Sequence, residues 1–182
     1  MTSCVSINSL QDGKTLGAGN LEIGINGDVG ALTDFVFDEA SYLAQFECFA
    51  RVGVAENLDV GIKLNSTAYG AMSVKGQVFG DKNSIFASSV GLEFGANIIA
   101  ETKEFYGLVT SYNSLSFFEN NVHFIFSPKY AFQRDAKLRT TDERHMLGLS
   151  YGLLVGNKIR MGIETTHFRV FNGINLPQNI NQ

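Results

Sequence analysis

The sequence of 182 residues is poor in several features that define other classes of protein. It has no tryptophan, two prolines and two cysteines, so it contains neither a disulfide framework nor a Cys-x-x-Cys metal site. Only 18% of its residues are charged, against about 25% in typical soluble domains. The net charge of −4 comes without any basic block, so no nucleic-acid partner is expected. No apolar run approaches the roughly 18 residues of a membrane-spanning helix, so a chain that crosses a membrane must do so as strands.

What the sequence does contain is a strict alternation of apolar and polar residues, clearest over residues 42–98. Even positions there carry mostly Val, Ile, Leu and Phe, while odd positions carry polar residues or glycine. Alternation at period two is typical of β-strands with one apolar face. The interruptions at 56–57, 66–67 and 81–83 consist of turn-forming residues. The pattern therefore predicts four strands of an antiparallel up-and-down meander.

The same pattern extends the meander toward both ends of the chain. Further strands are expected at about 16–32, 105–115, 122–133, 147–153 and 159–163. Nine strands fit one all-β domain, a meander barrel of about eight to ten strands. Residues 1–14 are predicted to be a flexible leader, 15–171 the barrel and 172–182 a polar tail. Pro128 cannot donate to a strand ladder, so a bulge or a locally unpaired position is expected there.

Alternation alone does not decide which face of the sheet lies inside the barrel. The polar face is rich in glycine: Gly24, Gly30, Gly53, Gly61, Gly91, Gly95, Gly148, Gly152 and Gly162 belong to it. A solvated outer face usually carries long polar side chains, and glycine weakens a strand there. Small residues suit the inside of a narrow barrel. We therefore predict that the polar face lines the lumen and that the apolar face points outward.

The polar face also carries charges of both signs and one histidine. The predicted lumenal set is Glu22, Glu47, Arg51, Asp59, Lys63, Lys75, Glu93, His123, Lys129, Arg160 and Glu164. Because an unpaired charge would be costly inside the barrel, these side chains are expected to pair across neighbouring strands. At eight to ten strands the interior is about filled by side chains, which disfavours an open porin channel.

No pattern in the chain is typical of a catalytic, metal or cofactor site. Gly-x-Ser-x-Gly, His-Glu-x-x-His and phosphate-loop motifs are all absent. His123 and Ser127 lie on the lumenal face and His167 precedes the polar tail, a set of residue types that lipid-hydrolysing barrels use. The favoured interpretation is structural, with no catalytic residue and no metal ligand, and we expect a protein that is not an enzyme.

The opening Met-Thr-Ser-Cys resembles the end of a bacterial lipobox, in which the cysteine is lipidated. The polar stretch 5–14 that follows has the composition of a tether. Cys4 is therefore a candidate lipid-attachment site. Cys48 falls on the apolar face of a strand, where the favoured interpretation is a small hydrophobic residue.

In its pattern, the stretch from Leu16 to Phe171 resembles small bacterial outer-membrane β-barrel proteins. The resemblance is clearest in RVGVAENLDVGIKL, from Arg51 to Leu64, a strand, tight turn and strand. It implies a transmembrane barrel in the bacterial outer membrane, with membrane lipid around an apolar band of about 9 to 11 residues per crossing. The count of nine strands departs from the even numbers of bacterial single-chain barrels.

Two functions remain open at this point. The first is an outer-membrane barrel with a narrow, side-chain-filled lumen and a structural or surface-interaction role, with a small pore as a variant. The second is a soluble, lipocalin-like barrel that carries a small apolar ligand. The two differ in the direction of the apolar face. Ile62, Leu92 and Leu149 point outward in the first and toward the barrel axis in the second.

Overall fold

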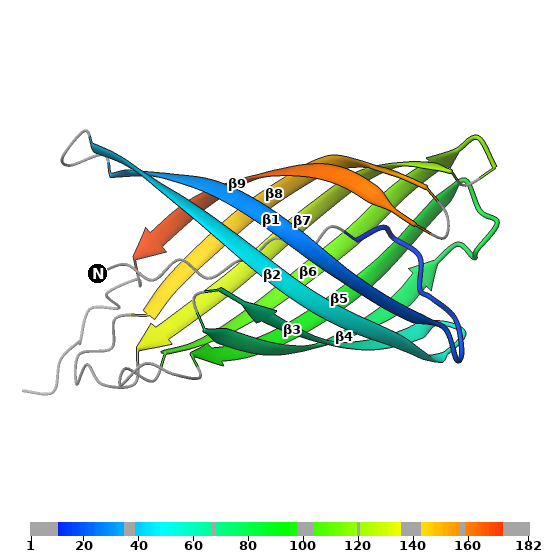
Figure 1. The fold of residues 1–182 in the computed structure, drawn as a ribbon, viewed down its shortest axis with the longest axis horizontal. Helices are drawn as coiled ribbons and strands as arrows, with labels where there is room; N and C mark the ends of the chain where they lie inside the picture. The colour runs from blue at the N-terminus through cyan, green and yellow to red at the C-terminus, as the bar shows by residue number, and fades with distance from the viewer. Residues whose placement is uncertain are drawn as a thin grey trace, which may run out of the picture.

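The protein is an all-β chain in which nine strands follow one another in a single curled sheet (Figure 1). The computed structural model describes residues 11–34, 39–66, 68–97, 104–119, 121–135, 143–156 and 159–172. The strands are β1 (Leu21–Asp34), β2 (Glu39–Ala55), β3 (Leu58–Asn65), β4 (Tyr69–Phe79), β5 (Phe86–Asn97), β6 (Glu104–Phe117), β7 (Val122–Asp135), β8 (Glu143–Val155) and β9 (Met161–Asn172). In the described part of the chain, no helix has the length and apolar character needed to cross a membrane.

Each strand pairs antiparallel with the next along the chain, which confirms the predicted meander. The number of strands lies within the expected range, and it is odd. With nine antiparallel strands, β1 and β9 run in the same direction. Within the described residues β1 pairs only with β2, and β9 pairs only with β8. A seam without ladder hydrogen bonds therefore separates the first and last strands.

The register aligns residues of the same kind across the sheet. One outward row runs from β1 to β8 through Leu21, Val52, Val60, Val74, Leu92, Val109, Tyr130 and Leu147. Because side chains alternate between faces, the adjacent row points the other way and includes Glu22, Arg51 and Glu93. The sequence alternation thus becomes an apolar belt on one face and a polar surface on the other.

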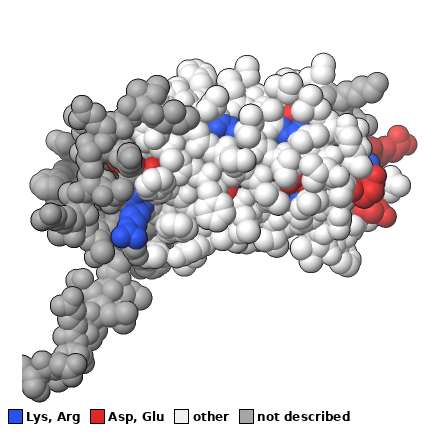
Figure 2. Space-filling model, turned by 90° about the horizontal axis from the view of Figure 1, so that it is seen from below, with Lys and Arg blue, Asp and Glu red and all other residues white. Residues whose placement is uncertain are grey.

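The apolar face is the exposed one. Ile62, Leu92 and Leu149 are 57%, 46% and 38% exposed, while Glu47 and Asp59 are each 1% exposed. Figure 2 shows few charged side chains along the side of the barrel visible in that view. The interior holds two small apolar clusters, one around Leu108 and Ala131 and one of Tyr69, Ala71 and Tyr106. Otherwise the buried side chains are mainly polar or charged.

The β6–β7 ladder is interrupted at Pro128, as the sequence predicts. On the β6 side, the register passes from the pair Thr110–Lys129 to the pair Asn113–Phe126 without a shift, leaving Pro128 unpaired. On the β8 side Pro128 lies opposite Leu149 in an uninterrupted register. The missing N–H of proline thus produces a locally unpaired position instead of a bulge. Register shifts occur elsewhere, between Gly53 and Ala55 and between Gln77 and Phe79.

Candidate functional site

Charged side chains gather in the lumen, and the structure brings the eleven residues selected from the sequence to this one face. All are buried or half-buried. Five are acidic and five are basic, with His123 as the eleventh. Each of the ten charged residues takes part in an ion pair: Glu22–Arg51, Glu22–Arg160, Glu47–Lys63, Glu93–Lys63, Asp59–Lys75 and Glu164–Lys129. The lumenal set is therefore balanced in charge as well as paired.

Two of these pairs join residues that face each other on neighbouring strands. Glu22 of β1 is the register partner of Arg51 of β2, and the guanidinium donates to the carboxylate. Asp59 of β3 lies opposite Lys75 of β4, with Nζ 3.6 Å from Oδ2. Directly opposed positions of this kind are the ones that a strand pattern predicts.

The pairs made by Lys63 reach further across the sheet. Its Nζ lies 3.4 Å from Oε2 of Glu47 on β2 and 2.7 Å from Oε1 of Glu93 on β5. Ala71 of β4 is the register partner of Lys63, and its short side chain lets the lysine pass over β4. The Tyr106 hydroxyl donates to the same Glu93 oxygen at 2.8 Å. One lysine thus neutralises two buried carboxylates from two different strands.

Lys129 makes a similar long contact in the other half of the barrel. Its Nζ is 2.7 Å from Oε1 of Glu164, two strands away. Gly148 of β8 lies opposite Lys129, and Ser150 lies beside it on the same face. The Thr166 hydroxyl also donates to this Glu164 oxygen, at 3.3 Å.

Arg160, just before β9, connects the two edges of the seam. Its guanidinium donates to Glu22 on β1, and also to Asp12 Oδ2 at 2.9 Å. These ion pairs hold the start of β9 to the start of β1 where no strand ladder does.

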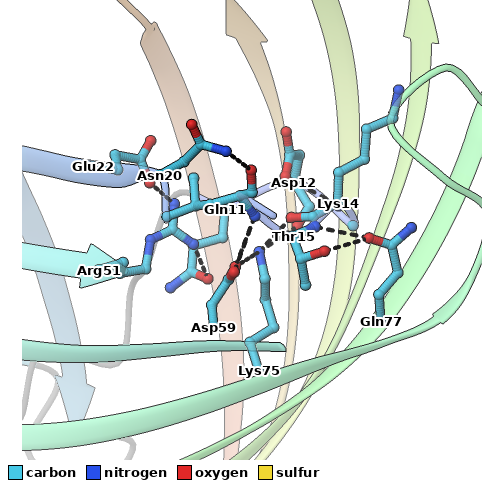
Figure 3. Close-up of polar contacts among 12 residues, drawn as sticks. Gln11, Asp12, Lys14, Thr15, Asn20, Glu22, Arg51, Asp59, Lys75 and Gln77 are labelled. Atoms are coloured by element: carbon cyan, nitrogen blue, oxygen red, sulfur yellow. Dashed lines mark hydrogen bonds and ion pairs between the residues drawn. The ribbon is translucent and has the colours of Figure 1, made fainter. Parts of the chain in front are cut away.

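The residues before β1 also lie inside the barrel (Figure 3). Gln11, Asp12, Lys14 and Thr15 are each less than a tenth exposed. We refer to Gln11–Leu16 as the N-terminal segment. The sequence assigned residues up to 14 to a flexible leader; the structure instead holds the last four of these in the lumen. Residues 1–10 lie outside the described part of the chain, so the leader stays a prediction there.

Wall residues from four strands hold this segment, mostly through its backbone. Ser114 Oγ accepts from Gly13 N at 3.0 Å, Gln77 Oε1 from Thr15 N at 2.9 Å, and Asp59 Oδ1 from Leu16 N at 3.0 Å. Lys75 Nζ donates to the Lys14 carbonyl at 2.6 Å, and Arg51 donates to Gln11 Oε1. Figure 3 shows Arg51, Asp59, Lys75 and Gln77 converging on the segment.

Electrostatics favour the charged form of Asp12, which lies outside the nine strands. Burial by itself would raise the pKa of this carboxyl group. The charges of Lys75, Arg160 and Arg51 outweigh burial and hold the pKa of Asp12 below its ordinary value. Asp12 therefore stays ionised as the counter-ion of the cationic wall.

Little space remains in this part of the lumen. Two cavities border Gln11 and Arg51, each with a volume of about 10 Å³. A cavity of that size holds roughly one water molecule. On other wall positions the hydroxyls of Ser89, Thr110 and Ser127 are buried without a hydrogen-bond partner among the described residues.

The three histidines do not form a catalytic set. His123 Nδ1 lies 3.0 Å from Ser116 Oγ in the lumen, so its hydroxyl neighbour is Ser116 and not Ser127. The other two histidines stack on tyrosines of adjacent strands: His145 on Tyr130 and His167 on Tyr151. No group of three or more potential metal ligands occurs among the described residues. This arrangement suits structural roles.

Sequence reasoning missed the N-terminal segment and its contacts with Gln77 and Ser114. Residues 11–16 show no strand alternation, and their contacts on the wall lie about 40 to 150 residues away in the chain. The candidate lipid site Cys4 lies outside the described residues and stays a prediction. Cys48 is an exposed free cysteine on the outward face of β2.

Comparison with known proteins adds no relative: no family model, no curated protein and no solved structure matches this chain.

Proposed function

We propose that the chain is a membrane-spanning β-barrel of the bacterial outer membrane with a narrow, side-chain-filled lumen and a structural or surface-interaction role. Membrane lipid is its main partner in this proposal. The outer-membrane location rests on the resemblance of pattern described above.

The observation that carries the proposal is that the apolar face of the sheet is exposed and the polar face is buried, the reverse of a soluble domain. Leu92 is 46% exposed while the next residue, Glu93, is 4% exposed. The same contrast holds at Val74 and Val109, which are 46% and 42% exposed next to the buried Lys75 and Thr110. Soluble monomers rarely expose apolar patches larger than a few hundred Å². A lipid-facing barrel, by contrast, alternates apolar outward and polar inward residues.

The filled lumen supports a structural role over that of an open porin. The charges of the lumen are paired, the N-terminal segment occupies one end, and the two cavities beside it have room for about one water each. An eight- to ten-stranded barrel has an interior of about the size that side chains fill.

Cell fractionation is the direct test of the proposal. The chain is expected in the outer-membrane fraction, to need detergent for extraction, and to change its gel mobility when heated. A chain that is soluble and monomeric in plain buffer would contradict the proposal and favour the lipocalin-like carrier. Labelling with a radioactive fatty acid, with Cys4→Ala as the control, tests the lipid attachment separately.

A paired substitution distinguishes lipid from water around the barrel. Leu92→Arg is expected to destabilise a lipid-facing strand by about 2–4 kcal/mol, because the charge would enter the apolar band. Ile85→Arg is the matched control: Ile85 is also exposed and lies just before β5, where about 0–1 kcal/mol is expected near the interface. In a soluble barrel both substitutions would be close to neutral.

A further inference from the structure

The N-terminal segment is attached to the barrel differently from any strand. Within the described part of the chain, no backbone ladder joins Gln11–Leu16 to a strand. Each hydrogen bond described above between the segment and the wall involves at least one side chain. Backbone pairing begins only at Gly19, whose N–H donates to the Gly53 carbonyl at 2.8 Å. The segment could therefore leave the lumen without breaking the sheet.

The segment supplies oxygen atoms to three cationic side chains of the wall. Arg51 donates to Gln11 Oε1, Arg160 to Asp12 Oδ2, and Lys75 to the main-chain oxygens of Asp12 and Lys14. Glu22 and Asp59 are the only acidic wall residues that pair with these three cations among the described residues. Withdrawal of the segment would thus leave a polar, charged passage where the oxygens had been.

One residue of the segment has no room for a side chain. A Cβ on Gly13 would collide with the carbonyl group of Ala87 on β5. The collision is with backbone of the sheet, which cannot move aside as a flexible side chain can. Glycine at this position therefore permits the segment to lie against the wall.

We propose that Gln11–Leu16 is a displaceable plug, and that the barrel conducts small ions when the plug is withdrawn. The inference rests on the proposed membrane-spanning function. It adds a closed state held by wall side chains and an open state in which Arg51, Lys75 and Arg160 face the passage.

The test records conductance of the full chain in planar bilayers with potassium chloride as the probe. Gly13→Val is expected to expel the plug sterically. The frequency of conducting events should then rise about tenfold or more, because the plug loses one or two hydrogen bonds to charged groups of the wall. Gly76→Val is the matched control, because a Cβ at Gly76 meets no atom within 4 Å. The wild-type chain and Gly76→Val are both expected to stay closed.

A synthetic peptide of residues 9–17 provides a second readout. Added to the Gly13→Val barrel, it is expected to block the conductance, because it restores the oxygens that the three cations bind. The same peptide with Gly13 replaced by valine should not block. Asp12→Lys, which places a third positive charge against Arg160 and Lys75, is the second variant and should open the barrel by charge repulsion, with Gly13 left in place.

Several outcomes would overturn the plug. One is a Gly13→Val barrel that inserts and stays as closed as the wild type; another is a wild-type barrel that conducts as often as the variant. Failure of both Gly13→Val and Asp12→Lys to fold would mean that the segment is an integral part of the barrel, which also contradicts the proposal. Failure of the wild type to insert into any bilayer would instead contradict the membrane function itself.

Discussion

The two halves of the barrel wall fill the same narrow lumen in different ways. Strands β1–β5 line it with long charged side chains, seven of the ten lumenal charges in all. Strands β6–β9 line it mainly with hydroxyls, from Thr110, Ser114, Ser116, Ser127 and Ser150. Of the ten charged residues in the lumenal set, Lys129 and Glu164 lie on these strands and Arg160 precedes β9.

The difference explains where the N-terminal segment lies. Long side chains such as Arg51 and Lys75 reach across the lumen and bind the oxygens of the segment. Short side chains let the backbone approach closely, as Gly13 does toward Ala87 of β5 and Ser114 of β6, which face each other where the two halves meet. The charged half holds the plug by charge, and the small residues at the boundary between the halves make room for it.

The largest effect is expected from the charged half. Lys63→Met leaves Glu47 and Glu93 buried near each other without the lysine's positive charge. Breaking a buried ion pair by removing one partner costs about 3–5 kcal/mol, so the free energy of unfolding should fall by that amount. Urea titration in lipid vesicles, followed by circular dichroism, measures the loss. A change below about 1 kcal/mol would mean that water reaches these carboxylates.

The corresponding substitution in the hydroxyl half should cost less. Lys129→Met removes the counter-ion of a single carboxylate, Glu164, which keeps the Thr166 hydroxyl as a donor. We expect a loss of about 2–3 kcal/mol, since a charge-assisted hydrogen bond disappears while one donor remains. The same titration measures it. A loss equal to or larger than that of Lys63→Met would break the comparison between the halves.

The sequence predicted features that depend on neighbouring residues in the chain, and it did not predict contacts between residues far apart in the chain. Alternation of the kind seen at Leu92 and Glu93 was sufficient to predict the nine strands, because it is a pattern of residues close in the sequence, and the glycines of the polar set indicated which face lies inside. Directly opposed pairs such as Asp59–Lys75 follow from the same pattern. The contacts of Arg160 with Asp12 and Glu22 do not, since they join opposite ends of the chain across a seam that has no register. Strand ends were also underestimated: the ladder with β8 carries β9 to Asn172, beyond the last clearly alternating residues at 159–163.

A smaller effect is expected where the hydroxyl half touches the plug. Ser114→Ala removes the acceptor of the Gly13 N–H group, which is buried against the wall. An unsatisfied buried donor costs about 1–3 kcal/mol, and here that cost falls on docking of the plug and not on the sheet. Conducting events should become more frequent, while the urea midpoint of the barrel should change little. An unchanged conductance would show that the charged half alone holds the segment.

The smallest effect is expected at Ser127, in the hydroxyl half but away from the plug. Its hydroxyl is buried and has no hydrogen-bond partner among the described residues, whereas that of Ser114 binds the segment. Removing a buried hydroxyl without a partner relieves its desolvation cost, so Ser127→Ala should be neutral or stabilising by about 1 kcal/mol. Urea titration measures the stability, and Ser114→Ala is the matched control on the same wall. A destabilisation of more than about 1 kcal/mol would reveal an ordered water bound to Ser127, and the hydroxyl half would then be a hydrated surface with its own polar network.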